Sequence, residues 1–174
     1  MKFTAPISRF EGSEVFWTSI IITPDKVYQK MILLSPKKRI ICTINNLYTF
    51  HCAMIPKNPF HYIMLSKEKI VALKLNINVE ISIEINPDKS QYGIDISEEF
   101  QEVLDSDENG KILFEKLTPG KQRSLIYLMN KTKNVTLKIE KSFVILEHLK
   151  RNKGTLDLEL LNEDFRNYRN QQKI

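Results

Sequence analysis

Apolar and polar residues alternate along the first half of the chain with a period of two, which is typical of β-strands with one buried face. Two short segments interrupt this alternation with helical spacing, and each follows a hydroxyl residue that can cap a helix. The pattern predicts the order strand, strand, helix, strand, and then the same order again. The expected strands are 2–10, 15–22, 38–44, 47–54, 60–65 and 79–85, and the expected helices are 24–34 and 67–75.

The two expected helices are capped at Thr23 and Ser66, 43 positions apart, while few residues are identical between the two copies. We interpret this as a repeat of pattern rather than of sequence. Six strands interrupted by two short helices predict a closed or nearly closed barrel, because closure removes exposed edge strands. The shared core is expected to include Phe16, Ile22, Ile41, Phe50, Tyr62, Ile81 and Ile83.

Beyond Asn86-Pro87-Asp88 the apolar spacing becomes helical. Short helices are expected from Ser97 and from Asn109, and a longer one follows the Thr118-Pro119 cap. The last clear helix, 135–153, carries an apolar stripe that we expect to be buried. That stripe consists of Val135, Ile139, Phe143, Leu146 and Leu149.

The sequence thus predicts an α+β protein. Residues 1–90 are expected to form a β-barrel domain with the repeated strand-strand-helix-strand pattern, and residues 91–154 a helical region that ends in a helical hairpin. Residues 155–174 form a tail for which two structures remain open, because its leucines alternate like a strand whereas its aromatic residues fit a helical turn.

The composition is ordinary for one globular domain with or without a short appendage. The chain has 174 residues, of which 42% are hydrophobic and 27% charged, and this length allows a real core. No apolar run approaches the roughly 18 residues that would span a bilayer. The first residues lack the apolar region of a signal peptide, so we expect a cytoplasmic protein.

The two cysteines flank a predicted hairpin turn. Asn45-Asn46 is typical of a two-residue turn, which would pair residue 42 with 49 and residue 39 with 52. In that register Cys42 and Cys52 lie on opposite faces of the sheet, which is poor geometry for a disulfide. We therefore expect structural thiols in a reducing compartment.

The net charge of +5 is concentrated in one stretch. Residues 121–153 contain nine basic and two acidic side chains, whereas the segments before and after each carry a net charge of −1. Clustered positive charge can contact phosphates or an acidic protein, although a solvated helix face is its more common meaning. Base stacking is unsupported, because Tyr127 and Phe143 both fit the buried stripe. The candidate interaction surface comprises Arg123, Lys131, Lys133, Lys138, Lys141, Lys150 and Arg151, with Lys138 and Lys141 expected to point to solvent.

Residues 105–112 match the first eight positions of a calcium-binding EF-hand loop. The twelfth position needs a bidentate glutamate, but Lys116 occupies it and Glu115 lies one residue early. We expect an acidic turn between helices rather than a calcium site. Thr118 to Lys121 lacks the first glycine and the final hydroxyl residue of a phosphate loop, which excludes that motif.

Histidine and cysteine also offer weak candidates for chemistry. Cys42, His51 and His61 could approach one another in the barrel, but three such residues normally need tighter spacing or a fourth ligand to hold a metal. No glycine-flanked serine nucleophile is present, and the Cys-His pair lacks a recognisable orienting partner. We expect no catalytic, cofactor-binding or metal-binding residues, and no cofactor.

Several short phrases occur along nearly the whole chain in a characteristic order. They are Phe3-Thr4-Ala5, Ile22-Thr23-Pro24, Arg39 to Met54, Tyr62 to Leu65, the helix ending in Leu104, Phe114 to Gly120, and Arg123. In this order they resemble the bacteriocin-protection YdeI/OmpD-associated family, whose N-terminal module is a domain of unknown function. The chain departs from the family at Asn46 and Asn78, where glycine is usual, and at Leu137, which replaces an arginine after Thr136.

The resemblance implies a double-split β-barrel, related in fold class to AbrB-like DNA-binding barrels, and a family without established catalysis. We therefore expect a non-enzymatic cytoplasmic adaptor in stress or bacteriocin protection that acts through a protein partner, without membrane insertion. The alternative is a nucleic-acid-binding barrel protein that uses the basic C-terminal helices. A small-ligand binder or enzyme ranks third.

Overall fold

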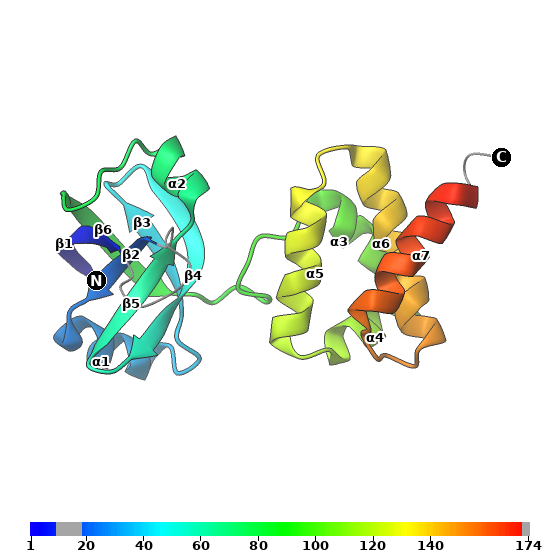
Figure 1. Ribbon diagram of the computed structural model, residues 1–174. Helices are drawn as coiled ribbons and strands as arrows, with labels where there is room; N and C mark the ends of the chain where they lie inside the picture. Colours follow the sequence, from blue (N-terminus) through cyan, green and yellow to red (C-terminus); the bar gives the residue numbers. More distant parts are fainter. Residues whose placement is uncertain (10–18, 172–174) are drawn as a thin grey trace. The chain divides into compact units, whose positions relative to one another are not determined.

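Figure 1 shows the computed structural model of the chain, which describes residues 1–9 and 19–171. The chain divides into two compact units, Met1–Gly93 and Ile94–Ile174, which we call the barrel unit and the helical unit. The described elements of the barrel unit are β1 (Lys2–Arg9), β2 (Ser19–Thr23), α1 (Asp25–Leu34), β3 (Arg39–Ile44), β4 (Tyr48–Lys57), β5 (Phe60–Leu65), α2 (Lys67–Ala72) and β6 (Glu80–Pro87).

The six strands form a closed antiparallel barrel in the order β1-β2-β5-β4-β3-β6, which confirms the predicted barrel. β1 closes it, because β1 pairs with β2 on one side and with β6 on the other. Each strand thus has two hydrogen-bonded neighbours and no exposed edge. Figure 1 shows α1 at one end of the barrel and α2 at the other.

The two helices of the barrel unit begin close to the predicted positions, but their caps differ. The Ser66 side chain accepts a hydrogen bond from the Lys69 N–H at 3.3 Å, as expected for an N-cap. Thr23 instead belongs to β2, and Pro24 occupies the N-cap position of α1. Pro24 suits this place because its fixed φ leads into a helix.

The barrel core is filled by side chains from all six strands, with Ile7, Ile21, Ile40, Ile63 and Ile83 among the fully buried ones. Of the predicted core residues, Phe50, Tyr62, Ile81 and Ile83 are buried, and Phe16 lies outside the described residues. Ile22 is 40% exposed and Ile41 half-buried, so the prediction is wrong for these two. Their neighbours Ile21 and Ile40 point inward instead, because side chains alternate between the two faces of a strand.

β3 and β4 are joined by a turn of three residues, not two. Ile44 pairs with Tyr48, and Asn45 and Asn46 both adopt left-handed φ angles of 51° and 56°. Asparagine tolerates this region because its short side chain can hydrogen-bond locally. The Asn45 side chain also accepts a hydrogen bond from the Ser82 N–H at 3.0 Å. The extra residue in the turn shifts the register of the hairpin by one position.

The shifted register brings the two cysteines to the same face. Cys42 lies opposite Phe50, and Cys52 lies opposite Ile40, so both cysteines point into the barrel and not to opposite faces as predicted. Both are free thiols. The hydrogen bond with Cys42, followed by burial, raises the pKa of the Cys52 thiol well above its usual value. A raised pKa keeps the thiol protonated, as expected for a structural cysteine.

The helical unit contains, within the described residues, five helices: α3 (Glu98–Ser106), α4 (Glu108–Lys116), α5 (Pro119–Lys131), α6 (Val135–Arg151) and α7 (Leu158–Gln171). Within the tail, for which a strand and a helix both fitted the sequence, Leu158–Gln171 form α7. α6 occupies the centre, because α3, α4, α5 and α7 all contact it. α5 and α6 therefore belong to a larger unit, in which other helices also contact α6.

The buried face of α6 matches the predicted apolar stripe only in part, because Leu146 and Leu149 are buried and the other three residues are not. Val135, Ile139 and Phe143 are 54%, 36% and 44% exposed. The helix presents a different side to its neighbours, and that side includes two polar residues. The buried residues of α6 are Ser142, Val144, Ile145, Leu146, His148 and Leu149.

Candidate interaction surface on the helical unit

Lys138 does not point to solvent as expected. Its Nζ lies 2.9 Å from Glu99 Oε2 on α3, and its side chain is 12% exposed. The hydrogen bond from Lys138 is the main reason why the pKa of Glu99 is lowered. Lys141, one turn later, donates a hydrogen bond to Thr132 Oγ1 at 3.3 Å and lies 5.8 Å from the ring centroid of Phe165. Both lysines therefore contact neighbouring parts of their own unit.

The basic residues at the end of α6 are also paired. Lys150 Nζ lies 2.8 Å from Asp107 Oδ2 and also contacts Glu147 one turn earlier. The hydrogen bond from Lys150 is the largest of the influences that lower the pKa of Asp107. Arg151 Nη2 lies 2.6 Å from Asp164 Oδ2 on α7. These pairs neutralise the positive charge where the sequence showed it most concentrated.

The remaining members of the predicted surface lie on α5 and after it. Lys131 Nζ stands 4.9 Å from the ring centroid of Tyr127, one turn earlier on α5. Arg123 and Lys133 form no ion pair within the part of the chain that the structure describes. The structure therefore does not bring the seven basic residues together into one free positive surface.

The charge of the chain is distributed differently once it is counted by structural unit. Residues 94–174 contain 14 basic and 14 acidic side chains, whereas residues 1–93 contain 12 basic and 7 acidic ones. The basic stretch of α5 and α6 is thus balanced by the acidic helices of the same unit. The net charge of +5 belongs to the barrel unit.

A buried histidine joins α6 to α7. His148 is fully buried, its Nδ1 lies 2.8 Å from Asp164 Oδ2, and its Nε2 accepts the Asp157 N–H at 3.3 Å. Because Nε2 accepts, Nδ1 carries the proton and donates it to Asp164. Burial alone would raise the pKa of Asp164, but the hydrogen bonds from Arg151 and His148 outweigh burial and lower it. Both imidazole nitrogens are engaged in holding α7 in place.

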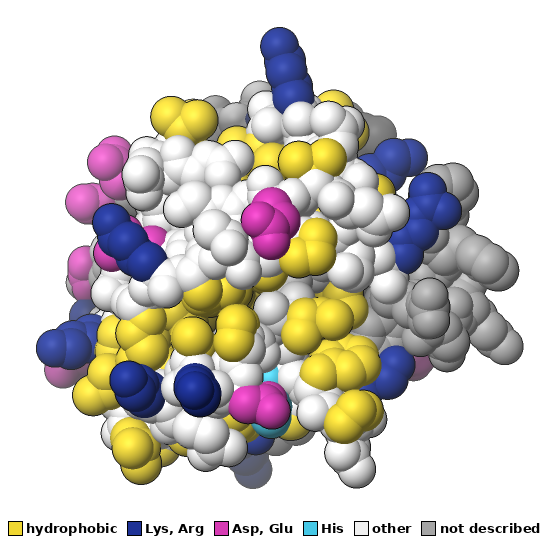
Figure 2. Space-filling model, turned by 90° about the vertical axis from the view of Figure 1, so that its left-hand side faces the viewer, with side chains coloured by type: hydrophobic (Ala, Val, Ile, Leu, Met, Phe, Trp, Pro, Cys, Tyr) yellow, Lys and Arg dark blue, Asp and Glu magenta, His cyan; other side chains and the backbone are white. Residues whose placement is uncertain are grey.

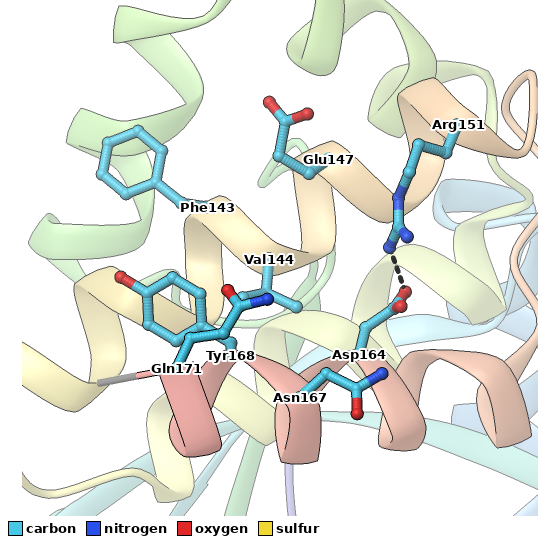
Figure 3. Close-up of a pocket in the computed structure, with 8 residues that line it drawn as sticks. All are labelled: Phe143, Val144, Glu147, Arg151, Asp164, Asn167, Tyr168 and Gln171. Atoms are coloured by element: carbon cyan, nitrogen blue, oxygen red, sulfur yellow. Dashed lines mark ion pairs between the residues drawn. The ribbon is translucent and has the colours of Figure 1, made fainter. Parts of the chain in front are cut away.

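Beside this junction, α6 and α7 form a groove of about 270 Å³. Figure 3 shows Phe143 and Tyr168 at one end of the groove and the ion pair between Arg151 and Asp164 at the other. The groove therefore combines an aromatic end with a charged end. Its lining residues are Phe143, Val144, Glu147, Arg151, Asp164, Asn167, Tyr168 and Gln171.

An exposed apolar row on α6 leads into this groove. The row consists of Val135, Ile139 and Phe143, which are four residues apart and so lie along one side of the helix. Single exposed apolar residues are ordinary, whereas a row that ends in a groove is typical of a binding surface. Sequence reasoning assigned the row to the core. The sequence does contain a sign of this difference. Val144 and Ile145 are apolar but lie outside the stripe, so a second side of α6 could also be buried.

A second pair of histidine and carboxylate lies in the barrel unit. His51 Nδ1 is 2.8 Å from Asp88 Oδ2, and Ser90 donates its N–H and its hydroxyl to Asp88 Oδ1 at 3.0 and 2.6 Å. Burial alone would raise the pKa of Asp88, but the hydrogen bonds from Ser90 and His51 lower it. The Ser90 hydroxyl donates to the carboxylate and not to the imidazole, unlike the nucleophile of a serine–histidine relay. The network fastens the segment after β6 to β4.

The residues that match a calcium loop are held in other contacts. Only residue 107 separates α3 from α4. The Asp107 side chain caps α4 by accepting the Gly110 N–H at 2.9 Å, and Asp105 Oδ1 lies 2.7 Å from Lys111 Nζ. Over residues 1–9 and 19–171, no three or more histidine, cysteine, aspartate or glutamate side chains are grouped to hold a metal ion.

Comparison with known proteins adds no family. The chain matches no protein-family model, and no curated protein is significantly similar to it. The resemblance to the YdeI/OmpD-associated family therefore rests on the short phrases of the sequence. Among the described helices, none is both long and apolar enough to cross a membrane.

Proposed function

We propose that the protein is a non-enzymatic adaptor that binds a protein partner through the α6 row and the adjoining groove. The observation that carries this proposal is the exposure of Val135, Ile139 and Phe143 on a helix that other helices otherwise cover. An amphipathic helix with apolar residues three or four positions apart is the partner segment that fits such a row. Phe143 is the expected anchor, because it belongs both to the row and to the groove.

The balance of charge supports a protein partner over a polyanion at this surface. The acidic and basic residues of the helical unit are equal in number, and Lys138 and Lys150 are held in ion pairs. Long-range attraction of nucleic acid requires an excess of positive charge. A protein segment that buries apolar side chains requires none.

Nucleic-acid binding by the same helices is the second candidate. Tyr127 is 51% exposed and Lys131 lies 4.9 Å from its ring, a combination of aromatic and basic side chains that single strands can use. This candidate has less support, since one such pair provides one stacking position and the unit has no net charge to attract the strand.

The wider role follows the resemblance of the sequence. We include in the proposal a cytoplasmic function in stress or bacteriocin protection, a barrel of the double-split type, and a hairpin of α5 and α6. The short phrases of the sequence support the role and the barrel type, and the helical spacing of the apolar residues supports the hairpin. The partner identified through α6 would decide between protection and another adaptor role.

Affinity capture with two matched variants tests the proposal. Phe143→Ser removes the anchor, whose residue is 44% exposed. Ile112→Ser removes an apolar side chain on α4 that is nearly as exposed, at 43%. Both variants should keep the melting temperature of the wild type. The wild type and Ile112→Ser should capture the same partner from the native cytoplasm, and Phe143→Ser should lose it. With the purified partner, the affinity should fall at least about tenfold in Phe143→Ser, as for a central anchor.

Two results would contradict the proposal. If Phe143→Ser captures and binds the partner as the wild type does, the α6 row is not the docking surface. If nuclease treatment removes all captured material and Tyr127→Ser abolishes its binding, the second candidate replaces the first.

A further inference from the structure

α1 buries one side against the barrel and exposes two leucines on the other. Tyr28 and Met31 are its buried residues. Leu33 and Leu34 are 81% and 62% exposed, although they are adjacent and end the helix. Two neighbouring leucines in water form an apolar spot that no described residue covers. An exposed apolar patch rimmed by polar residues is typical of a site of protein or membrane interaction.

Three lysines lie near these leucines, on α1 and just after it. Lys30 and Lys26 lie one and two turns before Leu33 on the same side of α1, and Lys37 follows the helix. These three lysines form no ion pair with any residue of the described chain. Asp25 is the one acidic residue of α1, and it lies at the first position, near His61. The lysines therefore contribute to the net charge of +5 that the barrel unit carries.

Figure 2 looks onto the barrel unit from the left-hand side of Figure 1. Hydrophobic and basic side chains lie next to one another on the lower part of this view, with acidic and histidine side chains beside them. Apolar and basic side chains are thus neighbours on this part of the surface. We call the set Lys26, Lys30, Leu33, Leu34 and Lys37 the α1 face.

We propose that the α1 face docks the protein on the surface of a membrane that contains anionic lipids. Headgroup phosphates match the lysines, and the boundary between headgroups and acyl chains accepts leucine side chains without any groove in the protein. Nucleic acid would match Lys26 and Lys30 equally well but would leave Leu33 and Leu34 in water. The combination of groups therefore favours a lipid surface over a nucleic acid.

The contact expected is peripheral, reversible and sensitive to salt. α1 has ten residues and stays packed on the barrel through Tyr28 and Met31, so only its outer side is available to lipid. Each lysine near an anionic surface contributes roughly fivefold to the binding constant. The attraction is screened over a Debye length of about 8 Å at physiological ionic strength. This inference stands on the barrel unit and is independent of partner binding by α6.

Flotation of the full chain with vesicles tests the proposal. One set of vesicles is pure phosphatidylcholine, and in the other part of this lipid is replaced by phosphatidylglycerol. The variants are Lys26→Glu with Lys30→Glu, and Leu33→Ser with Leu34→Ser. The control is Leu47→Ser. Leu47 is an exposed leucine, at 85%, but it lies in the turn after β3 and not on α1. All changed residues are exposed, and melting temperatures confirm that each variant is folded.

The wild type and Leu47→Ser should float with the anionic vesicles and not with pure phosphatidylcholine. The lysine variant should bind at least about 25-fold more weakly, because each of the two lysines that it loses contributes roughly fivefold and the glutamates add repulsion. The leucine variant should also lose binding, whereas an interaction through charge alone would leave it unchanged. The proposal is overturned if the wild type does not bind anionic vesicles, if the leucine variant binds as the wild type does, or if duplex DNA or RNA is bound in place of the vesicles.

Discussion

The junction between α6 and α7 allows a prediction whose magnitude follows from its geometry. Asp164 is 9% exposed and accepts from both His148 Nδ1 and Arg151 Nη2. In Asp164→Ala, the Nδ1–H group of the fully buried His148 no longer has an acceptor for its hydrogen bond. Loss of a buried hydrogen bond to a charged group costs about 1.5–3 kcal/mol, and the exposed Arg151 adds at most about 1 kcal/mol. We therefore expect Asp164→Ala to destabilise the helical unit by about 2–4 kcal/mol.

The matched control is Arg151→Ala, which should lower the free energy of unfolding by less than about 1 kcal/mol. The Arg151 side chain is 59% exposed, so water can take its place beside Asp164. Unfolding in urea is followed by far-ultraviolet circular dichroism, and hydrogen exchange of peptides resolves the two units, which need not unfold together. Asp164→Ala should reduce the protection of α7 amides and leave that of the barrel strands unchanged. The double variant with His148→Ala should be less destabilised than the sum of the single variants, since the two residues are in contact.

The reasoning is refuted if Arg151→Ala destabilises the protein as much as Asp164→Ala does. It is equally refuted if α7 exchanges at the wild-type rate when Asp164 is removed, because α7 would then be held by its apolar contacts alone.

Four further results are expected. Lys138→Glu should lower the melting temperature of the helical unit more than Arg123→Glu does, because only Lys138 is held between helices in an ion pair; equal melting temperatures would contradict this. Carboxylates with a lowered pKa, such as Asp88, contribute stability that is present above about pH 4 and lost as the pH falls below it, so the melting temperature should fall in that window, and Asp88→Asn should weaken the fall. Calorimetric titration should detect no calcium binding tighter than about 10 μM, and binding abolished by Asp105→Ala would reverse this conclusion. Separate chains of residues 1–45 and 46–93 should not fold, because each half of the barrel unit lacks strands needed to close the barrel; a cooperative melt of either half would count against a single core.

The sequence by itself determined the elements and their order. Strand alternation predicted all six strands, and the Ser66 cap and the Thr118-Pro119 pair marked the starts of α2 and α5. These signals are local, because the conformation of a strand or a helix depends on side chains a few residues apart. A closed or nearly closed barrel was predicted as well, because closure leaves none of the six strands with an exposed edge. The tail stayed open because its leucines and its aromatic residues fitted different periods.

Only the tertiary structure decided which faces are covered and which charges are free. One extra residue in the turn at Asn45 placed both cysteines inside the barrel, because side chains alternate with a period of two. The helical period determined the spacing of the α6 row but not which residues pack against it. Phe143 was therefore assigned to the core, although it is 44% exposed. Lys138 and Glu99 are 39 positions apart and pair because α3 packs on α6. The period of a pattern fixes how side chains are spaced along an element, whereas packing between distant elements fixes what each side chain meets.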